Sequence, residues 1–159
     1  MTDRSVKVKM AEYGVVEAPD QLITIGLGSC VGVTLYDKYK KIGGMVHIML
    51  PENRKGLKPA KYADTGIPLL IEEMKNLGAR KKHLKAKIAG GAKMFTVTSK
   101  DSSLNVGERN VIKVKEILKD LGISLLGEDT GANYGRTMKF FTDDGSVIIT
   151  SHKTDDKEL

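Results

Sequence analysis

The chain has 159 residues, 40% hydrophobic and 29% charged, which is typical of one globular domain with one core. No apolar run is long enough to cross a bilayer, and residues 1–10 lack the apolar stretch of a secretory signal, so we expect a soluble cytoplasmic protein. The net charge of +6 favours acidic partners, but aromatic residues make up only 5% and Trp is absent, which argues against stacking on single-stranded nucleic acid.

The first third of the chain predicts strands. Valine alternates with lysine over residues 6–9, and residues 22–27 are rich in β-branched and aliphatic side chains. Residues 31–36 show apolar side chains at period two, and residues 44–50 form an apolar run broken by one histidine. The polar segment 37–41 between these two runs suits a hairpin turn, so we expect them to pair.

A first amphipathic helix follows. Apolar side chains recur at helical spacing over residues 67–77, and Gly78 suits the end of the helix. Asp64 or Thr65 is the expected N-cap, and Pro68 fits only in the first turn.

A strand and a second amphipathic helix come next. Residues 84–89 predict the strand, which ends in two glycines, and residues 111–121 place apolar side chains on one helical face. Asn105 followed by Glu108 resembles a capping box, and Gly122 suits the helix end.

The last part of the chain returns to strands at residues 123–126, 137–142 and 146–151, with a hairpin signal at residues 143–145. Clustered strands joined by tight turns predict an α+β layered sandwich of mixed or antiparallel strands with two main helices, rather than a parallel doubly wound fold. We expect one domain over residues 1–159, with residues 153–159 as a frayed tail.

The segment around the single cysteine is the most informative. A predicted strand runs through Gly26 and Gly28 into Ser29 and Cys30, and glycines there allow a sharp turn and close approach of a substrate. Free backbone amides near Ser29 and Cys30 would then face a developing oxyanion. The other interpretation is a glycine-rich bend with a buried cysteine, and the residues alone leave both open. The segment lacks a third glycine and a following helix, which argues against nucleotide binding.

His47 lies inside an apolar predicted strand, where it is either a satisfied core residue or a positioned base. The predicted hairpin would bring Cys30 and His47 to the same end of the ladder, and a histidine beside a cysteine supplies the proton relay that acyl chemistry needs. Thr24, on the strand before the bend, has a hydroxyl that can orient the imidazole, although a structural role is the alternative.

The other two histidines, His83 and His152, have no cluster around them, and we place both at the surface. One cysteine and three scattered histidines match no ligand spacing, so we expect no metal.

Several motifs in chain order resemble the chemoreceptor glutamine deamidases (CheD). They lie at residues 26–31, 35–37, 43–51, 87–95, 106–111 and 129–136 and together cover nearly the whole chain. The pair Gly131-Ala132 departs from the paired glycines more usual there. The departure lies away from the candidate catalytic residues and affects only the expectation for the local loop.

The resemblance implies a catalytic cysteine, histidine and threonine, matching Cys30 in Gly-Ser-Cys, His47 in Met-x-His-x-Met-Leu-Pro and Thr24 before the bend. It implies a layered fold similar to toxin-type glutamine deamidases, hydrolysis of glutamine on methyl-accepting chemoreceptors through a thioester, and no cofactor. It also implies a CheC-type phosphatase partner. Backbone groups of Gly28 and Ser29 are the expected oxyanion donors.

Two alternatives stay open. The first is a non-catalytic chemotaxis adaptor that binds receptors or the phosphatase. The second is nucleic-acid binding, which is supported by the net charge alone.

Some residues of the resembling motifs have no role that the sequence defines, namely Arg109 and Asn110. Asp129 with Arg136 is most simply an ion pair. The pair Met94-Phe95 is either an exposed contact or buried.

Overall fold

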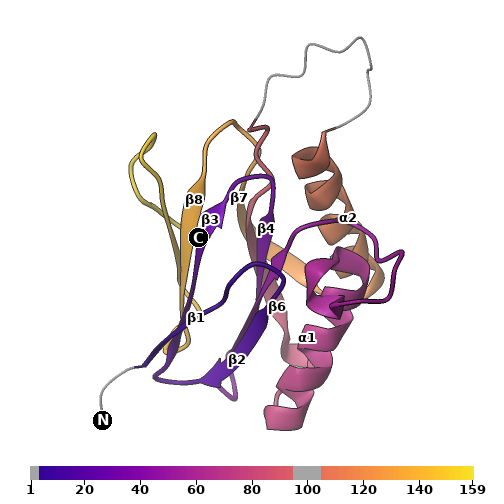
Figure 1. Cartoon of the computed structure of the whole chain (residues 1–159). Helices are drawn as coiled ribbons and strands as arrows, with labels where there is room; N and C mark the ends of the chain where they lie inside the picture. The colour runs from indigo at the N-terminus through magenta and orange to yellow at the C-terminus, as the bar shows by residue number, and fades with distance from the viewer. Residues whose placement is uncertain (1–3, 95–104) are drawn as a thin grey trace.

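The computed structural model describes residues 4–94 and 105–159. In this part of the chain, three layers are stacked: an outer sheet, a central sheet and a layer of two long helices (Figure 1). The strands are β1 (Ser5–Lys7), β2 (Tyr13–Glu17), β3 (Gln21–Leu27), β4 (Val31–Asp37), β5 (Ile42–Ile48), β6 (Lys85–Gly90), β7 (Ser124–Thr130), β8 (Arg136–Phe141), β9 (Val147–Thr150) and β10 (Lys157–Glu158). The helices are α1 (Ala63–Leu77) and α2 (Val106–Asp120), with 3-10 turns η1 (Pro59–Lys61) and η2 (Lys81–His83).

The two sheets have different strand orders. The outer sheet runs β1-β3-β8-β9-β10 and the central sheet runs β2-β5-β4-β6-β7. Most neighbours are antiparallel, and β1–β3 and β6–β7 are parallel. This mixed α+β sandwich confirms the predicted fold class.

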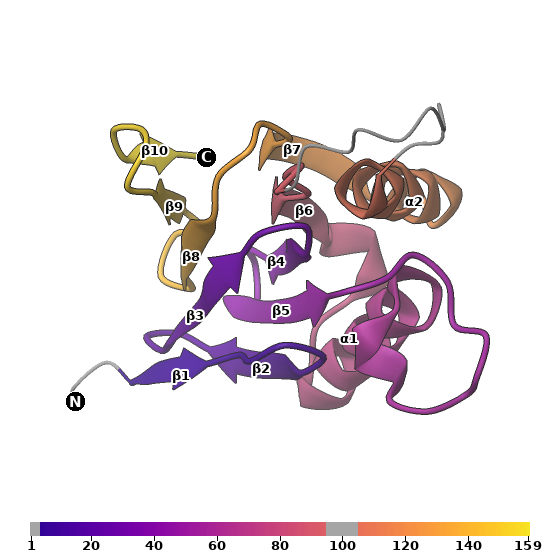
Figure 2. The same ribbon diagram turned by 45° about the horizontal axis from the view of Figure 1, so that its top comes forward.

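The central sheet is buried on both faces. Figure 2 shows α1 and α2 side by side on one of them, with the outer sheet on the opposite side. Strand β4 carries Val31, Val33 and Leu35 toward the helices, where they join Ile67 and Val114 in one apolar core. A second core lies between the sheets and contains Leu22, Leu27, Cys30, Met45, Met138 and Phe140. Because side chains alternate along a strand, β4 and β5 contribute to both cores.

Both predicted hairpins are present. Strands β4 and β5 pair antiparallel from Val31 opposite Ile48 to Asp37 opposite Ile42. Strands β8 and β9 pair around residues 143–145, where Gly145 has a φ of 81° and donates its N–H to the carbonyl of Phe141 at 2.8 Å.

The sequence patterns miss two strands. Strand β2 has only two valines beside a glycine, too short an apolar pattern to predict it. The tail, for which we predicted fraying, instead forms β10, where Lys157 and Glu158 pair with Ile149 and Ile148. Backbone pairing with an apolar strand orders these polar residues, a force that composition does not reveal.

Helix α1 begins earlier than predicted. Its N-cap is Tyr62, whose side chain makes no capping bond, and the carboxylate of Asp64 instead accepts from the backbone of Asn53 at 2.9 Å. Pro68 therefore lies inside the helix, beyond the first turn where we expected it. The predicted end at Gly78 is confirmed.

Helix α2 begins as predicted. The side chain of Asn105 accepts from the backbone N–H of Glu108 at 2.9 Å, and its amide donates to the Glu108 carboxylate at 2.8 Å. Within the described residues, neither helix has the length and hydropathy that crossing a bilayer requires.

Candidate active site

The predicted glycine bend lies between β3 and β4. Gly26 has a φ of 79°, a backbone conformation that favours glycine, and the pairing of β3 with β8 is irregular between Thr24 and Leu27. The irregularity redirects the chain from the outer sheet to the central sheet. Cys30 is the last residue before β4 begins.

The hairpin register places Cys30 and His47 on one face of the central sheet. Gly32 lies opposite His47, and Cys30 is two residues before Gly32 in the chain. Since side chains two apart point to the same face, both residues face the layer between the sheets. Cys30 is 9% exposed and His47 is fully buried.

Thr24 reaches His47 across the gap between the sheets. Its hydroxyl oxygen lies 2.7 Å from His47 Nδ1 and donates to the carbonyl of Val8, also at 2.7 Å. A hydroxyl has a single proton, and a carbonyl can only accept, so in the neutral imidazole the Thr24 oxygen accepts from Nδ1–H. His47 Nε2 then carries the lone pair, and it is buried with no hydrogen-bond partner in the part of the chain that the structure describes. This tautomer is the one that a general base needs.

Burial keeps both members of the candidate pair uncharged. It raises the pKa of the Cys30 thiol, and it lowers the pKa of His47 to about 4. The resting state at neutral pH is therefore a thiol and a neutral imidazole on one sheet face, rather than a thiolate and an imidazolium.

The carbonyls of the cysteine segment are all hydrogen-bonded, two by the backbone that follows β6 and one by α2. The Gly28 carbonyl accepts from Ala92 N–H at 2.9 Å, and the Cys30 carbonyl accepts from Gly91 N–H at 2.8 Å. The Ser29 carbonyl accepts from the side-chain amide of Asn110 at 3.0 Å.

The amides of the same segment are less engaged. Among residues 4–94 and 105–159, no acceptor receives the N–H of Ser29 or of Cys30. The Gly28 N–H donates to the Gly26 carbonyl at 3.1 Å, so it is not free as the oxyanion donor we expected. The backbone N–H groups of Ser29 and Cys30 are therefore the donors available to an oxyanion.

Close backbone approach explains a second glycine. Gly90 has a φ of 112°, and a Cβ atom there would lie 2.1 Å from the Cys30 carbonyl oxygen. Any side chain at residue 90 would therefore push the cysteine segment away from β6.

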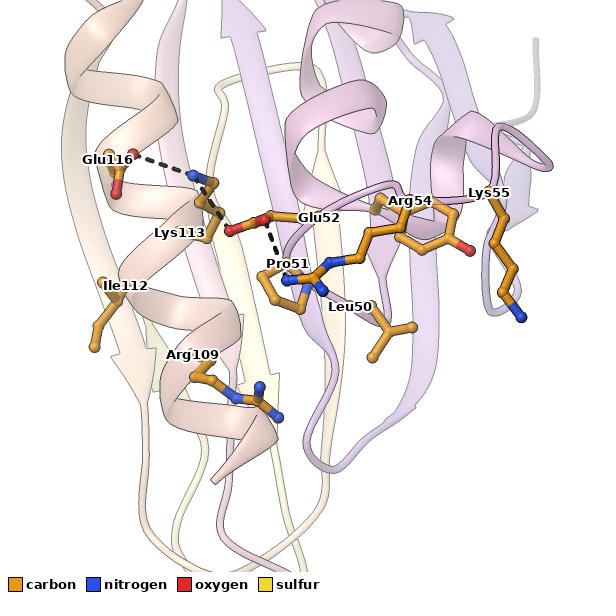
Figure 3. A pocket seen from close by; sticks show the side chains of 10 residues that line it. Leu50, Pro51, Glu52, Arg54, Lys55, Arg109, Ile112, Lys113 and Glu116 are labelled. Atoms are coloured by element: carbon orange, nitrogen blue, oxygen red, sulfur yellow. Dashed lines mark hydrogen bonds and ion pairs between the residues drawn. The ribbon is translucent and has the colours of Figure 1, made fainter. Parts of the chain in front are cut away.

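A groove lies between α2 and the segment after β5 (Figure 3). Lys113 bridges Glu52 at 3.7 Å and Glu116 at 3.2 Å within it. Arg109 lines the groove near the helix start, and Ile112 is 50% exposed. Thr24, Cys30 and His47 do not line it.

A second hollow borders the glycine bend. It is lined by Ile25, Gly26, Met94, Asn133, Tyr134, Gly135, Arg136, Thr137, Thr150, Ser151, His152 and Lys153. Met94 is 44% exposed, and its side chain packs against Gly28. Phe95, which we paired with Met94, lies outside the described residues.

Other sequence candidates are structural. The predicted ion pair of Asp129 and Arg136 is present at 3.0 Å, with Arg136 fully buried. His152 is exposed as expected, whereas His83 is partly buried because its Nδ1 lies 3.1 Å from the buried carboxylate of Asp37. No cluster of three metal-ligating side chains occurs in the described part of the chain.

Asn110 also lies at the candidate site, although local sequence patterns do not predict it there. It belongs to the buried stripe of α2 with Gly107, Val114 and Leu118. An asparagine on an apolar helical stripe is a signal of a buried hydrogen bond, but the partner lies 81 residues away in sequence.

Together, a buried thiol, a histidine oriented by a hydroxyl and two unengaged amides form an arrangement suited to cysteine-dependent acyl chemistry. Residues 49–151 match the family described as CheD chemotactic sensory transduction. The chain is 50% identical over 152 residues to a "Probable chemoreceptor glutamine deamidase CheD" of Caldanaerobacter subterraneus subsp. tengcongensis, covering 94% of both chains. The chain belongs to the CheD family.

Further relatives have the same name. One from Clostridium novyi is 49% identical over 152 residues, covering 94% of both chains. One from Clostridium botulinum is 49% identical over 162 residues, covering both chains completely. Among solved structures, the C-terminal domain of CNFy from Yersinia pseudotuberculosis aligns with a TM-score of 0.41 and 10% identity, over 98% of this chain and 62% of that one. That superposition is too loose to support an argument.

Proposed function

We propose that this protein is a chemoreceptor glutamine deamidase, which hydrolyses side-chain amides of methyl-accepting chemoreceptors to glutamate and ammonia. The observation that carries the proposal is the Thr24–His47 hydrogen bond at 2.7 Å, which leaves His47 Nε2, on the sheet face that Cys30 shares, with no partner among the described residues. The names of relatives about 50% identical over nearly the full chain supply the substrate class.

The first half of the reaction makes a thioester. Substrate binding brings the glutamine carbonyl to Cys30, His47 Nε2 takes the thiol proton, and the sulfur attacks the carbonyl carbon. The backbone N–H groups of Ser29 and Cys30 donate to the oxyanion. The protonated histidine then gives its proton to the amide nitrogen, the carbon–nitrogen bond breaks, and ammonia leaves.

The second half releases glutamate. His47, neutral again, takes a proton from water, and the hydroxide attacks the thioester carbon. The carbon–sulfur bond breaks, and the protonated His47 returns its proton to the sulfur, which restores the thiol. Thr24 keeps Nε2 as the reactive nitrogen throughout, because it accepts from Nδ1–H. No step uses a cofactor.

The decisive experiment measures ammonia release and maps glutamine-to-glutamate conversion by peptide mass spectrometry on a cognate receptor cytoplasmic fragment. We expect conversion by the wild type and none by Cys30→Ala, with the variant folded. Undiminished conversion by folded Cys30→Ala would overturn the mechanism.

We also propose that the protein works in the cytoplasm, binds a CheC-type phosphatase and does not bind nucleic acid. The groove with Arg109, Ile112 and Lys113 offers an exposed surface of mixed character for such a contact. If wild type and Cys30→Ala both bind the receptor but convert nothing, the adaptor function replaces the enzymatic one.

A further inference from the structure

The side chain of Asn110 links the two arms of the candidate site. It is fully buried in α2, and its Nδ2 donates to the Ser29 carbonyl at 3.0 Å and to the Met49 carbonyl at 3.0 Å. Ser29 precedes Cys30, and Met49 is two residues beyond His47. One amide group therefore holds the nucleophile segment and the end of the strand that carries the base.

The orientation of this amide is fixed by chemistry. Both partners are carbonyls, which only accept, so the NH₂ group must face them and Oδ1 must point away. Oδ1 is buried and has no hydrogen-bond partner in the described residues. A buried acceptor without a partner is destabilising and offsets part of what the two donated hydrogen bonds contribute.

Peptide geometry connects the Asn110 bond to the reaction. In a trans peptide the C=O of one residue and the N–H of the next point in opposite directions. Asn110 holds the Ser29 carbonyl toward α2, so the Cys30 N–H in the same peptide points away from α2. No described residue accepts from that N–H.

We propose that Asn110 is a positioning residue, which fixes the Ser29–Cys30 peptide so that the Cys30 N–H donates to the oxyanion. The inference rests on the proposed deamidase function. Asn110 does not touch the reacting atoms itself. It acts through the backbone of the cysteine segment and through the Met49 carbonyl.

The test uses Asn110→Leu, which has a similar volume and no donor, and Asn110→Gln, which keeps the amide but moves it by one methylene. The matched control is Val114→Ala, a change at a fully buried position on the same helical stripe. For each protein we would measure kcat and KM on the receptor fragment, the free energy of unfolding, and the rate of Cys30 alkylation by iodoacetamide at pH 9.

We expect kcat to fall about 100-fold in Asn110→Leu and about tenfold in Asn110→Gln, with KM within threefold, since a lost or misaimed oxyanion donor acts in the transition state. Alkylation forms no oxyanion, so its rate should stay within threefold of wild type. Val114→Ala should lose stability but keep its kcat.

Three results would overturn the inference. One is a kcat near the wild-type value in both variants while the wild type turns over, which leaves the deamidase function standing. Another is a parallel fall of kcat and alkylation rate in Asn110→Gln, or an equal fall of kcat in Val114→Ala, which would make the role merely structural. The third is no turnover by the wild type, which would remove the proposed function and this inference with it.

Discussion

The two ends of strand β4 differ in how their polar groups are satisfied. At the far end, the buried Asp37 carboxylate accepts from the backbone of Tyr39, Lys40 and Arg80 and from His83. At the near end, His47 Nε2 and Asn110 Oδ1 are buried and find no hydrogen-bond partner among residues 4–94 and 105–159.

The same contrast appears in the ionisation of the two ends. Burial alone would raise the pKa of Asp37, but its hydrogen bonds outweigh burial and lower it, so the group is charged. Burial of His47 meets no such compensation and lowers its pKa to about 4. The polar groups at the Asp37 end of β4 are therefore hydrogen-bonded within the protein. Under the proposed function, those at the His47 end are available to bind a substrate.

The largest expected effect comes from removing the base. His47→Gln should lower kcat/KM by about 10³-fold or more, because a general base contributes 10²–10⁴-fold and His47 is the only titratable side chain that β5 carries. The measurement is ammonia release, with His152→Gln as the control at an exposed histidine. A loss below tenfold in folded protein would remove His47 from the mechanism.

The next effect separates orientation from packing. Thr24→Val should lower kcat by about 10–100-fold, because the histidine loses the acceptor for Nδ1–H. Thr34→Val is the matched control, since Thr34 is also buried in a strand and donates to a carbonyl at 2.9 Å, but contacts no histidine.

Both threonine variants should lose on the order of 1–3 kcal/mol of stability, because each leaves a carbonyl unpaired. Only Thr24→Val should lose turnover, and Thr24→Ser should restore it. Equal turnover in Thr24→Val and Thr34→Val would make Thr24 structural.

The buried histidine also predicts a pH dependence of stability. Below pH 6.5 the unfolded chain takes up a proton on His47, while the folded protein does not until about pH 4. The free energy of unfolding should therefore decrease as the pH is lowered from 6.5 to about 4. The decrease should be about 1.4 kcal/mol per pH unit, or roughly 3 kcal/mol in all. Denaturant unfolding of wild type and His47→Gln at several pH values tests it, and an identical slope in both would contradict it.

The smallest expected effect comes from a substitution at the Asp37 end of β4, where the buried carboxylate has hydrogen-bond partners. Asp37→Asn should lower stability by about 2 kcal/mol at pH 7, because its NH₂ group would face the Arg80 N–H or the two turn amides. Turnover should stay within twofold of wild type. Asp120→Asn, at an exposed site, controls for the lost charge, and a fall in turnover would mean that the two ends of β4 are coupled.

Local patterns were enough to predict most of the fold. The alternating apolar side chains of β4 and the apolar run of β5 predict a hairpin, and the hairpin is confirmed. Strand β10 was missed because Lys157 and Glu158 are polar and are ordered only by pairing with β9.

The candidate site divides in the same way. The Gly-rich bend and the shared sheet face of Cys30 and His47 follow from local sequence and one hairpin, whereas the contact of Thr24 also depends on packing of the outer sheet against the central one. The role of Asn110 depends on partners 81 and 61 residues away in sequence, which only packing of α2 against both arms reveals.

The close contact between Gly90 and the Cys30 carbonyl bears on when the candidate site forms during folding. The cysteine segment is held by donors at residues 91, 92 and 110, all on segments made much later in synthesis. Gly107 lies at the same junction, where a Cβ would lie 2.4 Å from the Ala92 carbonyl. Under the proposed mechanism, the geometry at Cys30 is therefore a non-local property, which forms only when β6 and α2 dock against the cysteine segment.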